Sequence, residues 1–185
     1  GSLEFHTWNS RLPDLREPDV AVFDLDPGEQ ASFGDVRRTA LKLHAVHQDL
    51  GLRSYAKTSG RTGMHVYVPL APGHSFGQVR SWVRVLADRL AAADPDLIAV
   101  AHGRTHQGRQ VTIDHAQNSI GRNTAAPYTV RAVPGAPVSA PVTWDEVEAG
   151  RLHPADLTLR TMRARIANVG DLFAPVLLGG QHLPG

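Results

Sequence analysis

The sequence of 185 residues contains no cysteine, which excludes disulfide bridges and thiolate zinc sites. It also lacks any apolar run approaching the roughly 20 residues that a membrane-spanning helix needs, and no signal peptide is recognisable. Lysine is scarce, because Lys42 and Lys57 are the only two among 19 lysines and arginines. The formal net charge is +1, so a nucleic-acid surface has to come from local patches. We therefore expect a soluble, cytoplasmic protein without a membrane partner.

The stretch from Val20 to Gly28 combines an apolar run with two carboxylates one residue apart. Alternate residues of a strand point to the same face, roughly 6.5–7 Å apart, so Asp24 and Asp26 should project together from a buried strand. Two like charges that close repel each other, and burying them is costly unless a cation lies between them. Metal binding and an ordinary acidic turn, for which Asp-Pro-Gly is also typical, both remain open for this stretch alone.

Hydrophobic periodicity predicts strands and helices in the order β-α-β-β-α-β. The strands are expected at 20–26, 52–57, 64–70 and 110–114, and the helices between residues 32 and 51 and from 75 to 93. This order is the split βαβ arrangement that RNA-recognition domains share, so the predicted fold is α+β and RRM-like. In that topology the first strand lies between the third and the fourth. Asp24, Asp26, His65 and Asp114 would then share one face of the sheet.

A single domain is predicted, with three parts. These are an N-terminal strand and connector (1–19), a core (20–150) and a C-terminal helical extension with a frayed tail (151–185). Further short elements are expected as strands at 3–8 and 128–132, a short helix from Trp144 and a helix within 154–167. The chain beyond Asp114 is expected to be rich in loops.

Three carboxylates in this arrangement, Asp24, Asp26 and Asp114, are sufficient to hold two Mg²⁺ or Mn²⁺ ions. Hard divalent cations prefer oxygen ligands and complete their shells with water and substrate phosphates. Two such ions about 3.5–4 Å apart can stabilise both the attacking and the leaving oxygen in a phosphoryl displacement. An exposed or salt-bridged side chain is the alternative for Asp114.

The segment from Lys57 to Gly63 places two glycines, three hydroxyl groups and two cations between two predicted strands. Glycine lets backbone N–H groups approach a phosphate, and hydroxyls with lysine or arginine complete an anion site. The segment lacks the Gly-Lys-Ser/Thr of a Walker loop, and a flexible hairpin loop with solvated charges is the alternative. For His65 and Arg131 the alternatives are a hydrogen-bonded histidine at a strand end and a surface salt bridge.

Ten histidines raise the question of a zinc site. His44 and His47 are three residues apart on a predicted helix, and His102 and His106 would share a face if their segment were helical. Neither pair has a third ligand at a spacing known for zinc. Solvated surface histidines are therefore the favoured interpretation.

Three separate motifs resemble those of the archaeo-eukaryotic primase superfamily. They are Val22-Phe23-Asp24-Leu25-Asp26, Ser59-Gly60-Arg61-Thr62-Gly63-Met64-His65 and Val111-Thr112-Ile113-Asp114. Further segments at 4–8, 126–131 and 136–146 bring the sequence closer still to the polymerase domain of bacterial DNA ligase D, an enzyme of non-homologous end joining. The resemblance extends from about residue 4 to residue 150.

The resemblance implies a template-dependent DNA/RNA nucleotidyltransferase that extends a primer 3′-hydroxyl and fills gaps at broken DNA ends. Asp24, Asp26 and Asp114 would bind two Mn²⁺ or Mg²⁺ ions on an RRM-like palm. The incoming NTP or dNTP would contact a second set of residues: His6, Lys57, Ser59, Gly60, His65, Gln117 and Arg131. Ku and a DNA ligase domain are the protein partners that the family implies, and association with the nucleoid is expected.

The resemblance begins at Glu4, without the family's N-terminal part that supplies contacts to the 5′-phosphate and the template. An excised catalytic core and a natural minimal version both remain open, and recognition of the 5′-phosphate is not expected from this sequence. Thr62 stands where a more basic residue is expected, and His115-Ala116 replaces an aromatic-leucine pair. Two other functions remain open. A non-catalytic RRM-like module for nucleic acid or nucleotides would favour exposed aromatic residues over three carboxylates. A DxD phosphohydrolase would need a nucleophile-plus-lysine pattern, which does not follow Pro27.

Overall fold

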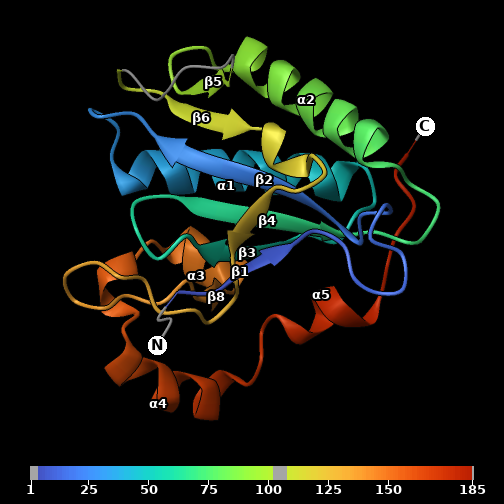
Figure 1. Cartoon of the computed structure of the whole chain (residues 1–185). Coiled ribbons are helices and arrows are strands. Elements are labelled where there is room, and N and C mark those ends of the chain that lie inside the picture. Colours follow the sequence, from blue (N-terminus) through green and yellow to red (C-terminus); the bar gives the residue numbers. More distant parts are fainter. Residues whose placement is uncertain (1–3, 102–107, 185) are drawn as a thin grey trace.

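The structure is a computed structural model that describes residues 4–101 and 108–184 (Figure 1). It contains a six-stranded sheet in the order β5-β6-β2-β4-β3-β8 and a separate two-stranded sheet. The large sheet consists of β2 (Val20–Pro27), β3 (Tyr55–Thr58), β4 (Met64–Pro69), β5 (Ile98–Val100), β6 (Val111–Asp114) and β8 (Pro141–Val142). The small sheet pairs β1 (His6–Trp8) with β7 (Asn123–Ala125).

The centre of the large sheet has the predicted split βαβ arrangement. β2 lies between β4 and β6 and is antiparallel to both, and β3 pairs with β4. The predicted α+β fold with this central strand is therefore confirmed. At the edges, β5 runs parallel to β6 and β8 pairs with β3. These two short strands do not follow from the sequence pattern.

Helices α1 (Phe33–Asp49) and α2 (Phe76–Ala93) cover one face of the large sheet (Figure 1). Each begins after a serine, Ser32 or Ser75, whose side chain forms a capping box with the residue three positions later. Gly51 follows the end of α1 with a φ of 70°, a left-handed conformation that suits glycine. Both helices therefore lie where the sequence places them.

Alternation along β2 separates the hydrophobic core from the acidic residues. Phe23 and Leu25 are fully buried in the cluster that α1 and α2 form with the sheet. Because successive side chains point to opposite faces, Asp24 and Asp26 lie on the other face. The apolar alternation that builds the core thus also directs the two carboxylates away from the helices.

The acidic face of the sheet is covered in part. A second buried cluster, formed by Val20, Val22, Tyr67, Phe173 and Val176, joins β2 and β4 to the C-terminal segment that leads into α5 (Ala174–Leu178). The Tyr67 hydroxyl also lies 3.2 Å from Thr124 Oγ1 of β7, so the small sheet lies over this face. The end of β2 that carries the aspartates stays open.

The prediction of a strand at 128–132 is wrong. The segment makes an isolated bridge between Val130 and Val138 instead of a ladder. Tyr128 has a φ of 65°, in the left-handed region, and this conformation interrupts an extended chain.

The helix predicted within 154–167 is divided in two. A 3-10 turn, η2 (Pro154–Asp156), precedes the helix α4 (Leu159–Val169). Between them the Leu157 carbonyl accepts a hydrogen bond from the Val138 N–H at 2.6 Å, and Thr158 bridges Pro137. This pairing holds the chain extended, which a continuous helix would not allow. By contrast, α3 (Trp144–Ala149) starts at the predicted residue.

The described helices of this chain are each too short or too polar to span a lipid bilayer.

Candidate active site

Four charged or titratable side chains form one row across the large sheet. Asp24 on β2 pairs in register with Asp114 on β6 and with His65 on β4, and Lys57 on β3 pairs with His65. Residues directly opposite each other on neighbouring strands lie on the same face. Asp26 comes two positions after Asp24 and therefore shares that face. The topology brings the three carboxylates to one side of the sheet.

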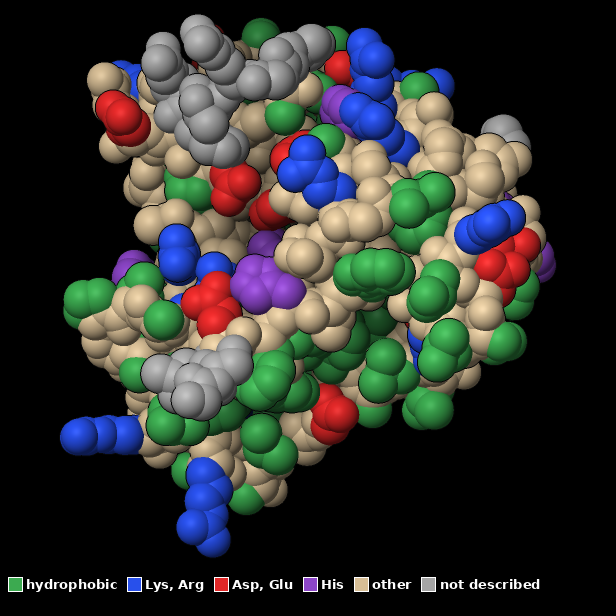
Figure 2. Space-filling model, in the orientation of Figure 1, with side chains coloured by type: hydrophobic (Ala, Val, Ile, Leu, Met, Phe, Trp, Pro, Cys, Tyr) green, Lys and Arg blue, Asp and Glu red, His purple; other side chains and the backbone are tan. Residues whose placement is uncertain are grey.

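A cleft of about 350 Å³ opens over this row. Seven predicted site residues line it: His6, Asp24, Asp26, Ser59, His65, Gln117 and Arg131. Arg61, Thr62 and the three residues of β7 complete its walls. Figure 2 shows acidic, basic and histidine side chains gathered on the left of that view, where the surface is hollowed. Three predicted site residues, Asp114, Lys57 and Gly60, lie outside this lining.

Asp24 is 8% exposed and lies in an acidic neighbourhood. Burial, together with the charges of Asp26 and Asp114, raises the pKa of Asp24 well above its usual range. Its Oδ1 lies 3.2 Å from Nε2 of His65, but no described group completes a hydrogen bond with that oxygen. A buried, unpaired carboxylate oxygen is costly unless a cation or a proton satisfies it.

His65 faces Asp24 as a neutral ring. Burial, with the charges of Lys57 and Arg131, lowers the pKa of His65 well below its usual range. The Nδ1 atom of His65 lies 3.4 Å from the hydroxyl of Tyr67. A neutral ring supplies no positive charge to Asp24, so the charges that favour its ionised form are those of Lys57 and Arg131.

The three aspartates have the donor atoms that Mg²⁺ and Mn²⁺ prefer. Across residues 4–101 and 108–184, no three His, Asp or Glu side chains are drawn together closely enough to enclose a metal ion. The arrangement of the carboxylates is thus open. Two features of Asp24 nevertheless fit a divalent cation: its Oδ1 is unpaired, and its charge is repelled by those of Asp26 and Asp114. A bound cation would pair with the oxygen and reduce the repulsion.

The loop between β3 and β4 is shaped by a serine and its glycines. Ser59 Oγ accepts hydrogen bonds from the backbone N–H groups of Arg61 and Gly63, at 3.2 and 3.1 Å. Gly60 has a φ of 75°, and a Cβ atom at that position would lie 2.5 Å from Cγ of Arg131. Gly60 is therefore buried against Arg131, whereas the Arg61 side chain is exposed at the cleft.

Arg131 is a buried guanidinium that is held from two sides. Its Nη1 donates to the carbonyl oxygen of Ser59, and its Nη2 lies 3.2 Å from Oε1 of Glu4. Its Nε has no hydrogen-bond partner in the described part of the chain. Arg131 is 9% exposed yet lines the cleft. Arg131 thus forms a partly buried ion pair with Glu4, instead of the surface salt bridge considered as its alternative.

Lys57 lies beneath the cleft and is fully buried. Its Nζ donates to Ser139 Oγ at 2.5 Å and lies 5.8 Å from the centre of the Tyr67 ring. Burial lowers the pKa of Lys57 to about 7, although the charge of Asp24 opposes this change. Lys57 can therefore influence the cleft through its charge, from below its lining.

Gln117 and His6 reach the cleft from two other segments. Gln117 belongs to the 3-10 turn η1 (Ala116–Asn118), and its buried Oε1 has no hydrogen-bond partner among the described residues. His6 is exposed on β1, where its Nε2 lies 2.9 Å from Oε1 of Glu4. Both side chains line the cleft.

The expectation of solvated histidines is wrong for His47. This residue is fully buried, with its ring centre 5.0 Å from that of Phe23 and 6.0 Å from that of Trp82. His47 falls on the apolar stripe of α1, and this position outweighs the polarity of its ring. His44 is half-buried and stacks on a tryptophan. The other pair considered for zinc, His102 and His106, lies outside the described residues.

Comparison with protein-family models decides the family. Residues 1–173 match the model of the LigD primase-polymerase domain. The chain belongs to this family. Two similar curated proteins, both named multifunctional non-homologous end joining protein LigD, come from Pseudomonas aeruginosa and Mycolicibacterium smegmatis. The first is 36% identical over 149 residues, or 80% of this chain and 18% of the relative. The second is 35% identical over 182 residues, which are 95% of this chain and 23% of the relative. The LigD-type chain thus spans about a fifth of their length.

A solved structure shares the fold of this LigD family member. The polymerase domain of Mycobacterium tuberculosis ligase D in complex with DNA matches with a TM-score of 0.86 and 29% identity, over 97% of this chain and 64% of that one. The family that the sequence motifs indicate is therefore confirmed.

Glu4, Tyr67 and Thr124 are residues at this LigD-type site to which the motifs assign no role. Glu4 contacts His6, and Tyr67 contacts His65. Each is two positions from its partner, so the alternation of a strand could have indicated both. Thr124 carried no such signal, because β7 exists only through its pairing with β1.

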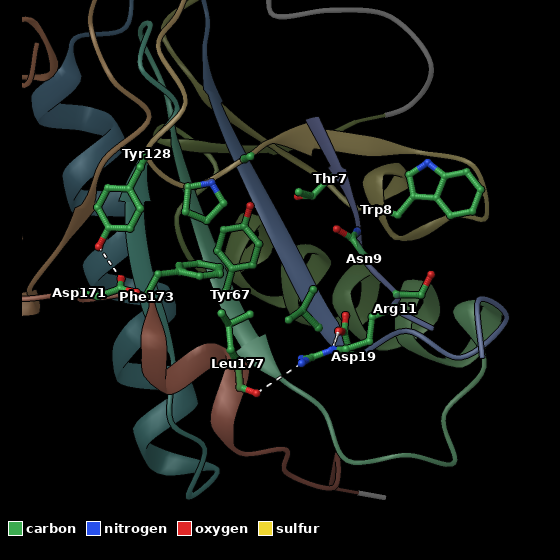
Figure 3. Close-up of a pocket in the computed structure, with 14 residues that line it drawn as sticks. Thr7, Trp8, Asn9, Arg11, Asp19, Tyr67, Tyr128, Asp171, Phe173 and Leu177 are labelled. Atoms are coloured by element: carbon green, nitrogen blue, oxygen red, sulfur yellow. Dashed lines mark hydrogen bonds and ion pairs between the residues drawn. The ribbon is translucent and has the colours of Figure 1, made fainter. Parts of the chain in front are cut away.

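A larger cavity, of about 570 Å³, lies beside β1 in this LigD-type domain (Figure 3). Its lining is mainly aromatic and aliphatic, with Trp8, Tyr67, Tyr128, Phe173 and Leu177 among its residues. Two polar pairs at its walls already satisfy each other: Tyr128 with Asp171, and Arg11 with Asp19. The smaller cleft, which holds unpaired buried groups, is the better candidate for chemistry on phosphates.

Proposed function

We propose that this chain is the catalytic domain of a template-dependent DNA/RNA primase-polymerase that adds nucleotides to a primer 3′-hydroxyl. The observation that carries the proposal is the position of Asp24. It is buried, register-paired with Asp114 and two residues from Asp26, and it borders a cleft that Arg131 also lines. Carboxylates for divalent ions and donors for phosphates adjoin each other there, as phosphoryl transfer requires.

The three aspartates would hold two Mn²⁺ or Mg²⁺ ions. When bound, such ions stabilise charge at the attacking hydroxyl and at the leaving pyrophosphate. The chain's own contribution is to keep Asp24 in a buried site where only a proton or a cation satisfies its Oδ1. The charge of Lys57 beneath the cleft favours the ionised form of Asp24.

The donors on the other wall of the cleft would bind the triphosphate. Ser59 Oγ accepts two backbone N–H bonds, so its O–H remains available to donate to a phosphate oxygen. Arg131 offers an Nε that lacks a described partner, and a guanidinium suits phosphate. The two ring nitrogens of His65 face Asp24 and the Tyr67 hydroxyl, so its contact with the triphosphate stays a prediction. Gln117 presents an unpaired amide oxygen, which can accept a hydrogen bond from a donor group of the nucleotide but cannot donate to a phosphate. Direct contact of Lys57 with the nucleotide stays a prediction.

The comparisons support DNA as a substrate. The M. tuberculosis domain is described in complex with DNA, and the curated relatives are named for non-homologous end joining. The proposed substrates are a primer–template or a broken DNA end with an NTP or dNTP, and the proposed role is gap filling or end processing in that repair. The chain covers 18–23% of those relatives, so partners of the whole protein cannot be carried over to it as findings. We include Ku, a DNA ligase domain and association with the nucleoid in the proposal.

Single-nucleotide extension of a labelled primer–template with Mn²⁺ tests the proposal. The wild type should add ATP or dATP opposite template T. Asp24→Asn keeps the size of the side chain but weakens it as a metal ligand, and we expect extension to fall by roughly 100-fold or more. Asp49→Asn changes an exposed aspartate at the end of α1 and should leave extension unchanged.

A wild type that binds DNA or nucleotide without incorporation, and whose binding Asp24→Asn does not alter, would overturn the proposal in favour of a non-catalytic RRM-like module. Nucleotide hydrolysis without a template would overturn it in favour of a phosphohydrolase. Extension that is lost in Asp24→Asn and kept in Asp49→Asn would support it.

A further inference from the structure

Glu4 joins two cleft residues that are far apart in the sequence. Its Oε1 lies 2.9 Å from Nε2 of His6 and 3.2 Å from Nη2 of Arg131. Its Oε2 accepts a hydrogen bond from the backbone N–H of Ala132 at 3.2 Å. A single carboxylate thus connects the segment that enters β1 with the loop that carries Arg131. Glu4 itself is not part of the cleft lining.

The Glu4 side chain acts as an anion in this position. The hydrogen bond with His6, the N–H of Ala132 and the charge of Arg131 together lower the pKa of Glu4 to about 2. Its side chain is 20% exposed, so solvent screens these contacts only in part. Hydrogen bonds to an ionised carboxylate are stronger than those to a neutral amide of the same shape.

Both partners of Glu4 depend on it for their direction. The Arg131 guanidinium is fixed at Nη1 by the Ser59 carbonyl and at Nη2 by Glu4. His6 is an exposed side chain on a strand of three residues, and its ring contacts the Glu4 carboxylate. Side chains that are already oriented lose less conformational entropy when a ligand binds.

We propose that Glu4 is a positioning residue that directs His6 and Arg131 toward the incoming nucleotide. The inference rests on the proposed function, because it takes the cleft as the site of a nucleoside triphosphate. Glu4 is not among the residues that line the cleft, and it reaches the cleft through His6 and Arg131, so we expect its effect on binding of the nucleotide more than on the chemical step. It acts through the two residues that it holds.

Glu4→Gln tests this role, because it keeps the length of the side chain and removes its charge. We expect the KM for ATP in primer extension to rise about tenfold while kcat stays within about threefold. The Kd of a fluorescent ATP analogue, measured with Mn²⁺, should rise by about the same factor. Glu4→Asp keeps the charge on a shorter side chain and should restore part of the affinity.

Glu146→Gln is the matched control. Glu146 forms a comparable part-buried pair with Arg165, between α3 and α4, away from the cleft. Its substitution should lower the Tm and leave the KM and the Kd unchanged. Such a result in Glu4→Gln, with Tm lowered and both constants unchanged, would overturn the positioning role, as would a Glu4→Asp that binds no better than Glu4→Gln.

Extension and binding report separately on the two proposals. A wild type that binds the nucleotide without extending a primer would overturn the polymerase function, whereas weaker binding by Glu4→Gln would still support the positioning role. A wild type that neither binds nor extends would overturn both.

Discussion

Asp24 and Asp114 lie directly opposite each other on the neighbouring antiparallel strands β2 and β6. The negative charge of Asp114 adds to that of Asp26 and to burial in raising the pKa of Asp24. A pair of carboxylates in this position destabilises the folded chain when Asp24 is ionised and no cation is bound. Sites that combine burial with like charges are typical of catalytic centres rather than of structural ones.

Replacing Asp24 by asparagine should therefore stabilise the chain in the absence of metal. We expect a gain of about 1 kcal/mol, or roughly 2–4 °C in Tm at neutral pH. The folded-state pKa of Asp24 is raised, so wild-type stability falls as the pH rises above the unfolded pKa of about 3.8 toward the higher folded value. The gain from Asp24→Asn should grow over the same range, as thermal unfolding at several pH values would show.

Addition of Mn²⁺ provides the complementary measurement. A ligand that binds only the folded state raises the Tm. Mn²⁺ should therefore raise the Tm of the wild type and change that of Asp24→Asn little. Asp49→Asn, which alters an exposed aspartate, should respond to Mn²⁺ as the wild type does. An Asp24→Asn variant that is less stable than wild type without metal would contradict the argument from charge repulsion.

The central strands and the carboxylate row could be predicted because they follow from local pattern. The alternation along β2 assigns Phe23 to the core and Asp24 to the opposite face, and the order of elements places β4 and β6 beside β2. The pattern therefore places Asp24 and His65 on the same face of the sheet, and the structure adds that they lie directly opposite each other.

The contacts of Arg131 could not be predicted in the same way. The segment around it is shaped by the left-handed Tyr128 and by the pairing of Val138 with Leu157, which are tertiary effects. Its partner Glu4 is brought to it by β1, a three-residue strand that is defined by β7 alone. The alternation at 3–8 predicts a strand here, but it does not indicate the pairing with β7 that brings Glu4 to Arg131.

His47 gives a second prediction, on acid stability. Both nitrogens of its ring lack described hydrogen-bond partners, and burial, with His44 nearby, lowers the pKa of His47 to about 3. The unfolded chain binds a proton at this residue below about pH 6.5, whereas the folded chain does not until about pH 3. Wild-type stability should therefore fall as the pH drops through this window, by about 1.4 kcal/mol per unit.

Substitution of His47 should remove this part of the acid sensitivity. His47→Leu should unfold at a higher temperature than wild type, with an advantage about 2 kcal/mol larger at pH 5 than at pH 7.5. His47→Gln separates the two causes, because it does not titrate but keeps a buried polar group. An unchanged slope of Tm against pH in both variants would rule out His47 as the source.

Gly60 gives a third prediction, which joins backbone conformation to the cleft. Its φ is 75°, and an added Cβ would meet Cγ of Arg131 at 2.5 Å and the backbone nitrogen of Ser139 at 2.9 Å. The arginine can move but the backbone cannot, so Gly60→Ala should push Arg131 out of its contact with the Ser59 carbonyl. We expect a loss of about 2 kcal/mol in stability and a rise of about tenfold in the Kd of a nucleotide.

Gly121→Ala separates backbone strain from this displacement. Gly121 has a φ of 78°, close to that of Gly60, but no atom lies within 4 Å of the Cβ that alanine would add. The free energy of unfolding of Gly121→Ala should therefore fall by about 1 kcal/mol, through the left-handed conformation alone. This variant should bind the nucleotide as the wild type does. Equal losses of Tm in the two variants, with equal and unchanged nucleotide affinity, would show that Gly60 serves only the turn. A larger loss confined to Gly60→Ala, with weaker binding, would show that the glycine is needed because Arg131 must pass over it to reach the cleft.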